Sequence, residues 1–354
     1  MGGITSEGSY LLSSDDGEKS SCRSLFLGAA FAGVSGSLYG IIGFISAILI
    51  ASGIFPYQQM FLMFGVSTVI SVTAVLWQRQ RVIWGVRTTI VMVGFGSALG
   101  FSYAAYCTAL LHIPVGTLTG LKTALFPVCS VIGGVVYLKE PLKISDVVGT
   151  GLTIVATLLF LHPTSIFGDN RRKTTPIEDE AERSKRDLVI GYSFSLLYAA
   201  ILSVIVITSS AVDKDVSNHT KAFYGNTISC LISVIFMLSM ETPVWRMKQS
   251  LAGMLVALCI SNTIAVSALT ASSQHGRAAL VSVILNMDFP VAYILQYIFL
   301  EENPPIILEV VGGLLILVSA CVMTLMSAWD SKRNMQKGDE PTDGESRAEV
   351  QDFN

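Results

Sequence analysis

The chain of 354 residues is 51% hydrophobic and only 14% charged, and its mean hydropathy is +0.60. A water-soluble protein is excluded, because the apolar residues form runs of about 20 with almost no charge inside, the length that a helix needs to cross a bilayer. The net charge of −3 offers no basic surface, so we expect no binding to nucleic acid.

Ten apolar runs predict ten transmembrane helices, since a helix rises about 1.5 Å per residue and the hydrocarbon core is about 30 Å thick. In chain order they are residues 27–50, 56–77, 89–111, 115–138, 144–162, 189–211, 221–240, 251–273, 277–300 and 306–328. The polar ends, 1–24 and 329–354, are predicted to be disordered tails, and the charged segment 163–188 to be a linker. The predicted fold class is therefore an all-α, multi-pass membrane protein.

An internal repeat relates the two sets of five spans, residues 25–162 and 189–328. A shift of 163 residues places Gly28 on Gly191, His112 on His275, Pro127 on Pro290 and Gly149 on Gly312. One offset that serves all five spans indicates a duplication. Because five is odd, the second copy must cross the membrane in the opposite direction, so we expect two inverted five-helix repeats, as in many secondary transporters.

Several short motifs follow one another in a characteristic order. They are Gly96 to Tyr106, Phe126-Pro127-Val128, Leu138-Lys139-Glu140, Val148-Gly149, Phe167-Gly168 and Met287-Asp288. This order resembles the EamA-type drug/metabolite transporter superfamily, and looks most like the G-type members of solute carrier family 35. The resemblance implies ten helices in two inverted repeats and a central cavity lined by helices 1, 3, 4, 6, 8 and 9. It also implies movement of a metabolite rather than chemistry on it.

Two residues with a fixed charge lie deep within the predicted spans, Lys122 in the fourth and Asp288 in the ninth. A charge at the centre of a membrane costs about 2.5–3.5 kcal/mol on insertion scales, so each should face a partner or a wet cavity. Lys122 could hold an anionic group while Asp288 titrates, or the two could alternately pair and part. The structural alternative is a permanent ion pair that only fixes helix packing.

Neutral polar residues and prolines provide the other candidates for a site. Tyrosine and amide side chains could bind a polar substrate or join neighbouring helices; they are Tyr103, Tyr106, Tyr198, Tyr293, Asn262, Asn286 and Gln296. Pro127 and Pro290 remove backbone donors at matching depths, which suggests paired hinges, broken-helix binding sites or ordinary kinks. His112 and His275 could gate protons at the helix ends or simply be solvated.

The predicted function is a secondary transporter or exchanger that moves a small polar, anionic metabolite by alternating access. The alternative is a membrane scaffold or regulator that acts through its tails. No catalytic motif indicates an enzyme, and no cysteine or histidine spacing indicates a metal or cofactor. We expect a small-molecule substrate and membrane lipid as partners, and glycine-rich helix faces allow a homodimer. Lysines and arginines in the loops predict that both termini are cytoplasmic. We expect the protein to lie in the plasma membrane or in an endomembrane.

Overall fold

The computed structural model describes residues 7–113, 115–160, 178–212, 216–299 and 307–338, and every regular element in these ranges is a helix. The helices are α1 (Glu7–Ala51), α2 (Pro56–Trp77), α3 (Val86–Leu110), α4 (Val115–Tyr137), α5 (Ile144–Phe160), α7 (Glu178–Ala211), α8 (Asn218–Met240), α9 (Gln249–His275), α10 (Ala278–Leu285), α11 (Asp288–Phe299) and α12 (Ile307–Gly338). The protein is thus all-α, as predicted.

Nine stretches within the described residues are long and apolar enough to span a membrane, and each coincides with a predicted span. The tenth prediction corresponds to α5, an apolar helix of 17 residues. One predicted span, 277–300, is not a single helix, because α10 ends at Leu285 and α11 begins at Asp288. The protein is an integral, multi-pass membrane protein whose ninth span is interrupted.

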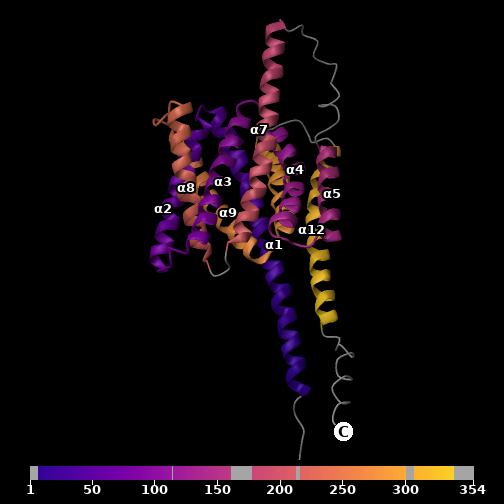
Figure 1. The fold of residues 1–354 in the computed structure, drawn as a ribbon. Coiled ribbons are helices and arrows are strands. Elements are labelled where there is room, and N and C mark those ends of the chain that lie inside the picture. The colour runs from indigo at the N-terminus through magenta and orange to yellow at the C-terminus, as the bar shows by residue number, and fades with distance from the viewer. Residues whose placement is uncertain (1–6, 114, 161–177, 213–215, 300–306, 339–354) are drawn as a thin grey trace, which may run out of the picture.

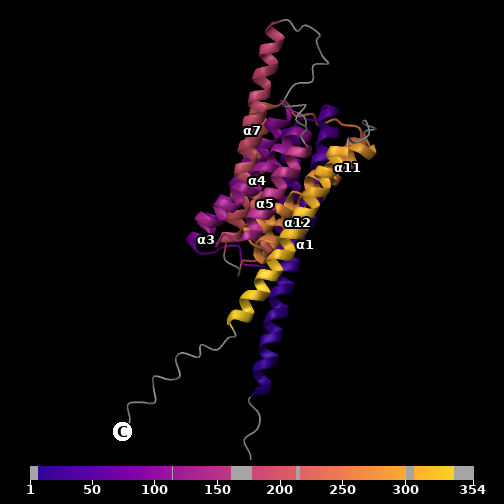
Figure 2. The same ribbon diagram turned by 90° about the vertical axis from the view of Figure 1, so that its right-hand side faces the viewer.

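The helices form one bundle with two distinct ends (Figures 1 and 2). The beginning of α1 and the end of α12 project from one end, here called the termini side. α5 ends and α7 begins at the opposite end, here called the linker side. α1 begins at Glu7 and α12 ends at Gly338. Both helices therefore extend into the segments that the sequence predicts to be disordered tails.

The interrupted span lies against α1, and two glycines of α1 make the close approach possible. A Cβ atom on Gly36 would lie 2.7 Å from the carbonyl oxygen of Leu285, and one on Gly40 would lie 2.5 Å from that of Asp288. Real Cβ atoms do not approach backbone so closely. Any larger residue at these positions would push α1 away from the interruption.

We therefore expect Gly40→Ala to lower the free energy of unfolding by about 1–3 kcal/mol, as overpacking does. Gly94→Ala is the matched control, because a Cβ on Gly94 of α3 meets nothing within 4 Å. That variant should be neutral or more stable by up to about 1 kcal/mol, since alanine is the better helix former. Denaturation in detergent micelles measures both, and equal effects of the two substitutions would contradict the assigned packing.

Candidate functional site

The interruption of the ninth span explains how Pro290 is accommodated. Pro290 is the third residue of α11, and the N–H groups of a first helical turn have no acceptor within the helix. The missing donor of proline is therefore harmless there. Asp288 is the first residue of α11, where the positive end of the helix dipole favours a carboxylate. The residues Asn286 and Met287 between the two helices are called the break below.

Lys122 and Asp288 meet in a buried ion pair. The Lys122 Nζ atom donates to both carboxylate oxygens of Asp288, at 2.7 and 2.6 Å. Lys122 is only 1% exposed and Asp288 8% exposed, and the ammonium also lies 5.8 Å from the ring centre of Phe126. α4 therefore supplies the cation, and the first residue of α11, directly after the break, supplies the anion.

Asn286 makes a second link between the break and α4. Pro127 has no N–H, so the carbonyl of Thr123, four residues earlier, lacks its usual helical donor. The Nδ2 atom of Asn286 donates to that carbonyl at 3.2 Å. α4 remains one continuous helix through Pro127, whereas the chain breaks ahead of Pro290. The two prolines, for which the sequence suggests hinges, broken helices or kinks, thus occupy different local structures.

A small central cavity, here called the tyrosine cavity, lies beside the ion pair. Its volume is about 20 Å³. It is lined by Tyr39, Gly40, Ile42, Gly43, Tyr103, Tyr106, Thr119, Tyr198, Asp288 and Ala292. Asp288 thus lies on the wall, whereas Lys122 is not among the described residues that line it. The space is large enough for about one water molecule and is far below the roughly 300–1,000 Å³ of small-molecule sites.

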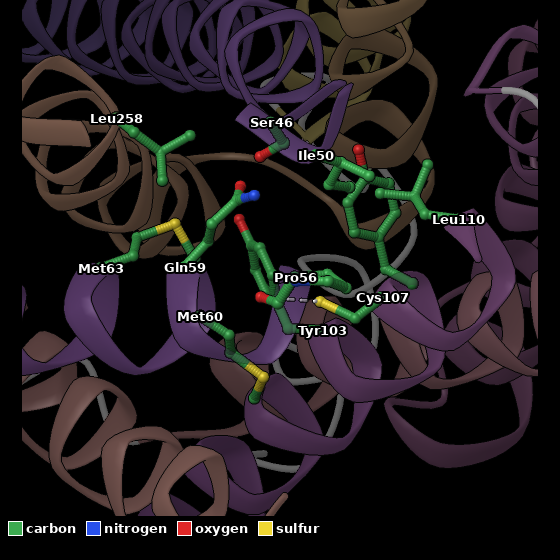
Figure 3. A pocket seen from close by; sticks show the side chains of 11 residues that line it. Ser46, Ile50, Pro56, Gln59, Met60, Met63, Tyr103, Cys107, Leu110 and Leu258 are labelled. Carbon is green, nitrogen blue, oxygen red and sulfur yellow. Dashed lines mark hydrogen bonds between the residues drawn. The ribbon is translucent and has the colours of Figure 1, made fainter. Parts of the chain in front are cut away.

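A second cavity of about 10 Å³ shares Tyr103 and Tyr106 with the first and lies toward the linker side. Figure 3 shows Ser46, Gln59 and Tyr103 pointing toward one another across it. Within the described part of the chain, the buried hydroxyl of Tyr106 has no hydrogen-bond partner. A buried hydroxyl without a partner is costly, so this group is poised to bond a molecule that enters either cavity.

The remaining predicted residues have different surroundings. Tyr103 donates to Oδ1 of Asn262 at 3.3 Å, and Nδ2 of Asn262 donates to Ser67 at 3.1 Å, so Asn262 holds Tyr103 from behind. Tyr198 lies on the cavity wall, and half-buried Tyr293 packs against the Phe289 cluster. The side chain of Gln296 lies outside the described residues.

Sequence reasoning missed Tyr39, Ser46 and Gln59, which line the two cavities. Tyr39 stands among the glycines of the first span, which by themselves indicate only close packing. A signal was nevertheless present, because Ser46 and Gln59 are polar residues inside apolar spans, where each polar group needs a partner or a cavity.

On the termini side, Arg277 joins the loop before α10 to the loop before α5. Its guanidinium donates to Asp146 at 2.9 and 3.3 Å and to the carbonyl of Pro141 at 2.7 Å, and it lies 3.8 Å from Glu140. Burial raises the pKa of the half-buried Glu140, and the charge of Arg277 opposes that shift. Asp146, in the first turn of α5, thus takes part in a contact between the two halves of the chain.

On the linker side, Glu241 joins the loop after α8 to the start of α2. Its carboxylate accepts from the backbone N–H groups of Tyr57 at 3.0 Å and Gln58 at 2.9 Å. Burial raises the pKa of Glu241, although these two hydrogen bonds oppose the shift. The carboxylate therefore occupies the positive end of α2 and holds the two halves together at this end.

The two histidines have unlike partners at the two ends. Nδ1 of His112 lies 3.3 Å from the carboxylate of Asp187, and Nδ1 of His275 lies 3.1 Å from the hydroxyl of Ser24. The repeat offset of 163 residues relates His112 to His275 and also Ser24 to Asp187. The histidines predicted as matching gates therefore occupy matching contacts, and only the one at the linker side faces a carboxylate.

The fold has a counterpart among proteins of solved structure. A crystal structure described only as that of a protein is similar to this chain with a TM-score of 0.63 and 20% sequence identity. The similarity covers 86% of this chain and 98% of the other. No family model matches the sequence. At this identity the comparison establishes a shared fold for the membrane bundle and nothing about its ligand.

The link between Asn286 and the proline carbonyl predicts a specific energetic coupling. Asn286→Ala should destabilise the protein by about 1–3 kcal/mol, because the buried carbonyl of Thr123 loses its donor. In a Pro127→Ala background the same substitution should cost much less, because residue 127 then supplies the helical N–H. A double-mutant cycle measures the coupling. Equal costs of Asn286→Ala in both backgrounds would contradict the assignment.

The raised pKa of Glu241 predicts how stability depends on pH. The folded protein binds the proton of Glu241 more tightly than the unfolded chain, so this group lowers stability as pH rises from its ordinary value of 4.5 through the raised pKa. Glu241→Gln removes that term and keeps an acceptor for α2. The melting temperature of the variant should therefore gain on that of the wild type as pH rises above 4.5. A difference that shrinks over this interval would refute the prediction.

Proposed function

We propose that the protein is a secondary transporter or exchanger that moves a small polar, anionic metabolite across a membrane by alternating access. The observation that carries the proposal is the buried Lys122–Asp288 pair, which joins the two halves of the chain at a helix break beside a central cavity. Interrupted helices at mid-membrane are typical of transporter binding sites, because they expose helix ends to an ion or substrate.

We further propose that the two halves are inverted repeats of the EamA type. The helix bounds support this, since α2 (Pro56–Trp77) shifted by 163 residues falls on α8 (Asn218–Met240), and α4 falls on α10 and α11 together. The contacts support it as well, because α1 packs on α9 as α3 packs on α7. α1 and α7 begin at opposite ends of the bundle, as inversion requires (Figure 1).

Charge balance suggests how the pair acts. The pair is neutral as a whole, and separating it inside the membrane leaves each partner as a costly unpaired charge. An anion that takes the ammonium of Lys122 would strand the carboxylate of Asp288. A proton on Asp288 removes that charge, so anion and proton enter together and the site stays neutral. Release on the other side restores the pair.

The small volumes of the two cavities also constrain the proposed transport cycle. Cavities of about 20 and 10 Å³ have no room for a metabolite, so α4 and the break must move apart before a substrate can bind. The contacts of Arg277 on one side and Glu241 on the other are then the closures that open in turn. The substrate leaves chemically unchanged, so in this proposal the protein is not an enzyme.

Variants that remove one or both charges of the Lys122–Asp288 pair distinguish a role in transport from a role in packing alone. Purified protein in liposomes is tested for uptake of carboxylates, phosphates and nucleotide sugars, with and without an inward proton gradient. Lys122→Met and Asp288→Asn should each abolish uptake. The double variant Lys122→Met, Asp288→Leu should fold as well as the wild type, because replacing a buried pair by apolar residues is often neutral, but it should still not transport. Lys139→Met, at an exposed lysine beyond α4, is the matched control and should transport normally.

Recovery of uptake in the double variant would reduce the pair to a packing role. A tail-driven scaffold or regulator is tested separately by removing residues 1–24 and 331–354. A transporter should keep its flux without these tails, whereas loss of the protein's effect in the absence of any flux would favour the scaffold.

A further inference from the structure

A groove of about 390 Å³ lies on the outer surface of the bundle, between α1, α12 and the end of α10. α1 and α12 pass beside each other in this region (Figure 2). The groove is lined by Phe26, Ala29, Gly33, Ile284, Met287, Leu317, Ala320, Cys321, Thr324 and Leu325. It is about twenty times the volume of the tyrosine cavity and belongs to a different face of the break.

Small residues of α1 create this groove. A Cβ on Gly33 would meet only Ile284, at 3.9 Å, which is an ordinary contact. The repeat offset places Tyr192 and Leu196 of α7 at the positions of Ala29 and Gly33. Bulky side chains at those positions would occupy the corresponding space in the other half. The groove is therefore a feature of this half rather than a general property of the fold.

We propose that the groove binds a hydrocarbon chain of a membrane lipid. The lining residues belong to stretches that are long and apolar enough to lie within a bilayer, so the medium at the mouth of the groove is lipid. Phe26 and Leu325, 48% and 59% exposed, flank that mouth with apolar surface. A lipid chain is the occupant that such a medium supplies.

The chemistry of the lining excludes a polar occupant. The hydroxyl of Thr324 already donates to the carbonyl of Ala320 at 2.7 Å. Water needs two to four polar partners, so it gains nothing in such a groove. The volume falls within the roughly 300–1,000 Å³ of sites that bind small molecules, so the open groove has room for part of an acyl chain.

A chain in the groove would act on the break. Met287 belongs to the break and Ile284 to the last turn of α10, and both line the groove. Asp288, the next residue, faces the tyrosine cavity on the other side. A bound lipid chain would therefore pack against one face of the break, while the ion pair lies on the opposite face. Lipid binding requires only that these helices lie within a bilayer, so the inference does not rest on the proposed transport function.

The test uses purified full-length protein in phosphatidylcholine liposomes that contain a phospholipid with a photoreactive diazirine in its acyl chain. Mass spectrometry locates the labelled residues after irradiation. Labels should be several-fold more frequent on Ile284, Met287 and Cys321 than on Leu314, a 56% exposed residue of α12 outside the groove. Labelling of Leu314 at the same frequency would overturn the proposal, because it would mean general contact with the bilayer.

Two glycine variants make the test specific. Gly33→Leu fills the groove and should lower labelling of Met287 and Cys321 several-fold. Gly313→Leu is the matched control, since a Cβ on Gly313 of α12 meets nothing within 4 Å, and it should leave the labelling unchanged. Unchanged labelling in a folded Gly33→Leu protein would overturn the site. Ala29→Phe fills the same groove from one turn away and replaces Gly33→Leu if that variant does not fold.

Discussion

The absence of water inside a membrane is the constraint on which this structure depends, because a polar group there that finds no partner within the protein is costly. Lys122 and Asp288 satisfy each other, and Asn286 satisfies the carbonyl that Pro127 leaves without a donor. Both links connect α4 to the same short region, the break and the first residue of α11. Charge, backbone hydrogen bonding and helix geometry are thereby concentrated at one contact between the two halves of the chain, and movement at that contact disturbs all three together.

Hydropathy predicted the spans well because the length of a membrane helix is set by the bilayer, and it singled out Lys122 and Asp288 because charge is rare inside spans. The break could not be predicted in the same way, since Asn286 and Met287 interrupt neither the apolar run nor its length. Tyr39 and Tyr198 were equally hard to assign, because a tyrosine on a cavity wall and one in a packed core look alike in a sequence. Their roles depend on which helices become neighbours.

The proposed duplication supplies a common scaffold, and the differences between the two halves supply the asymmetry that a site needs. The offset that pairs the two histidines leaves one facing Asp187 and the other facing Ser24. The same offset pairs Pro127 in a continuous helix with Pro290 beyond a break. It also pairs Gly33, beside a groove, with Leu196. The two halves thus have corresponding helix bounds, while the polar chemistry at each end and on each face is different.

The two parts of the interrupted span differ in how far they are buried in the bundle. All eight residues of α10 are buried, whereas Ile294, Tyr297 and Ile298 of α11 are exposed on the outer surface. In the proposed transport cycle, α10 would therefore be the fixed part and α11 the part that rotates about the break. The 12 residues of α11 rise about 18 Å, so a rotation of about 10° moves the far end by about 3 Å. In that cycle, a small rotation beside Asp288 would become a larger displacement at the linker side.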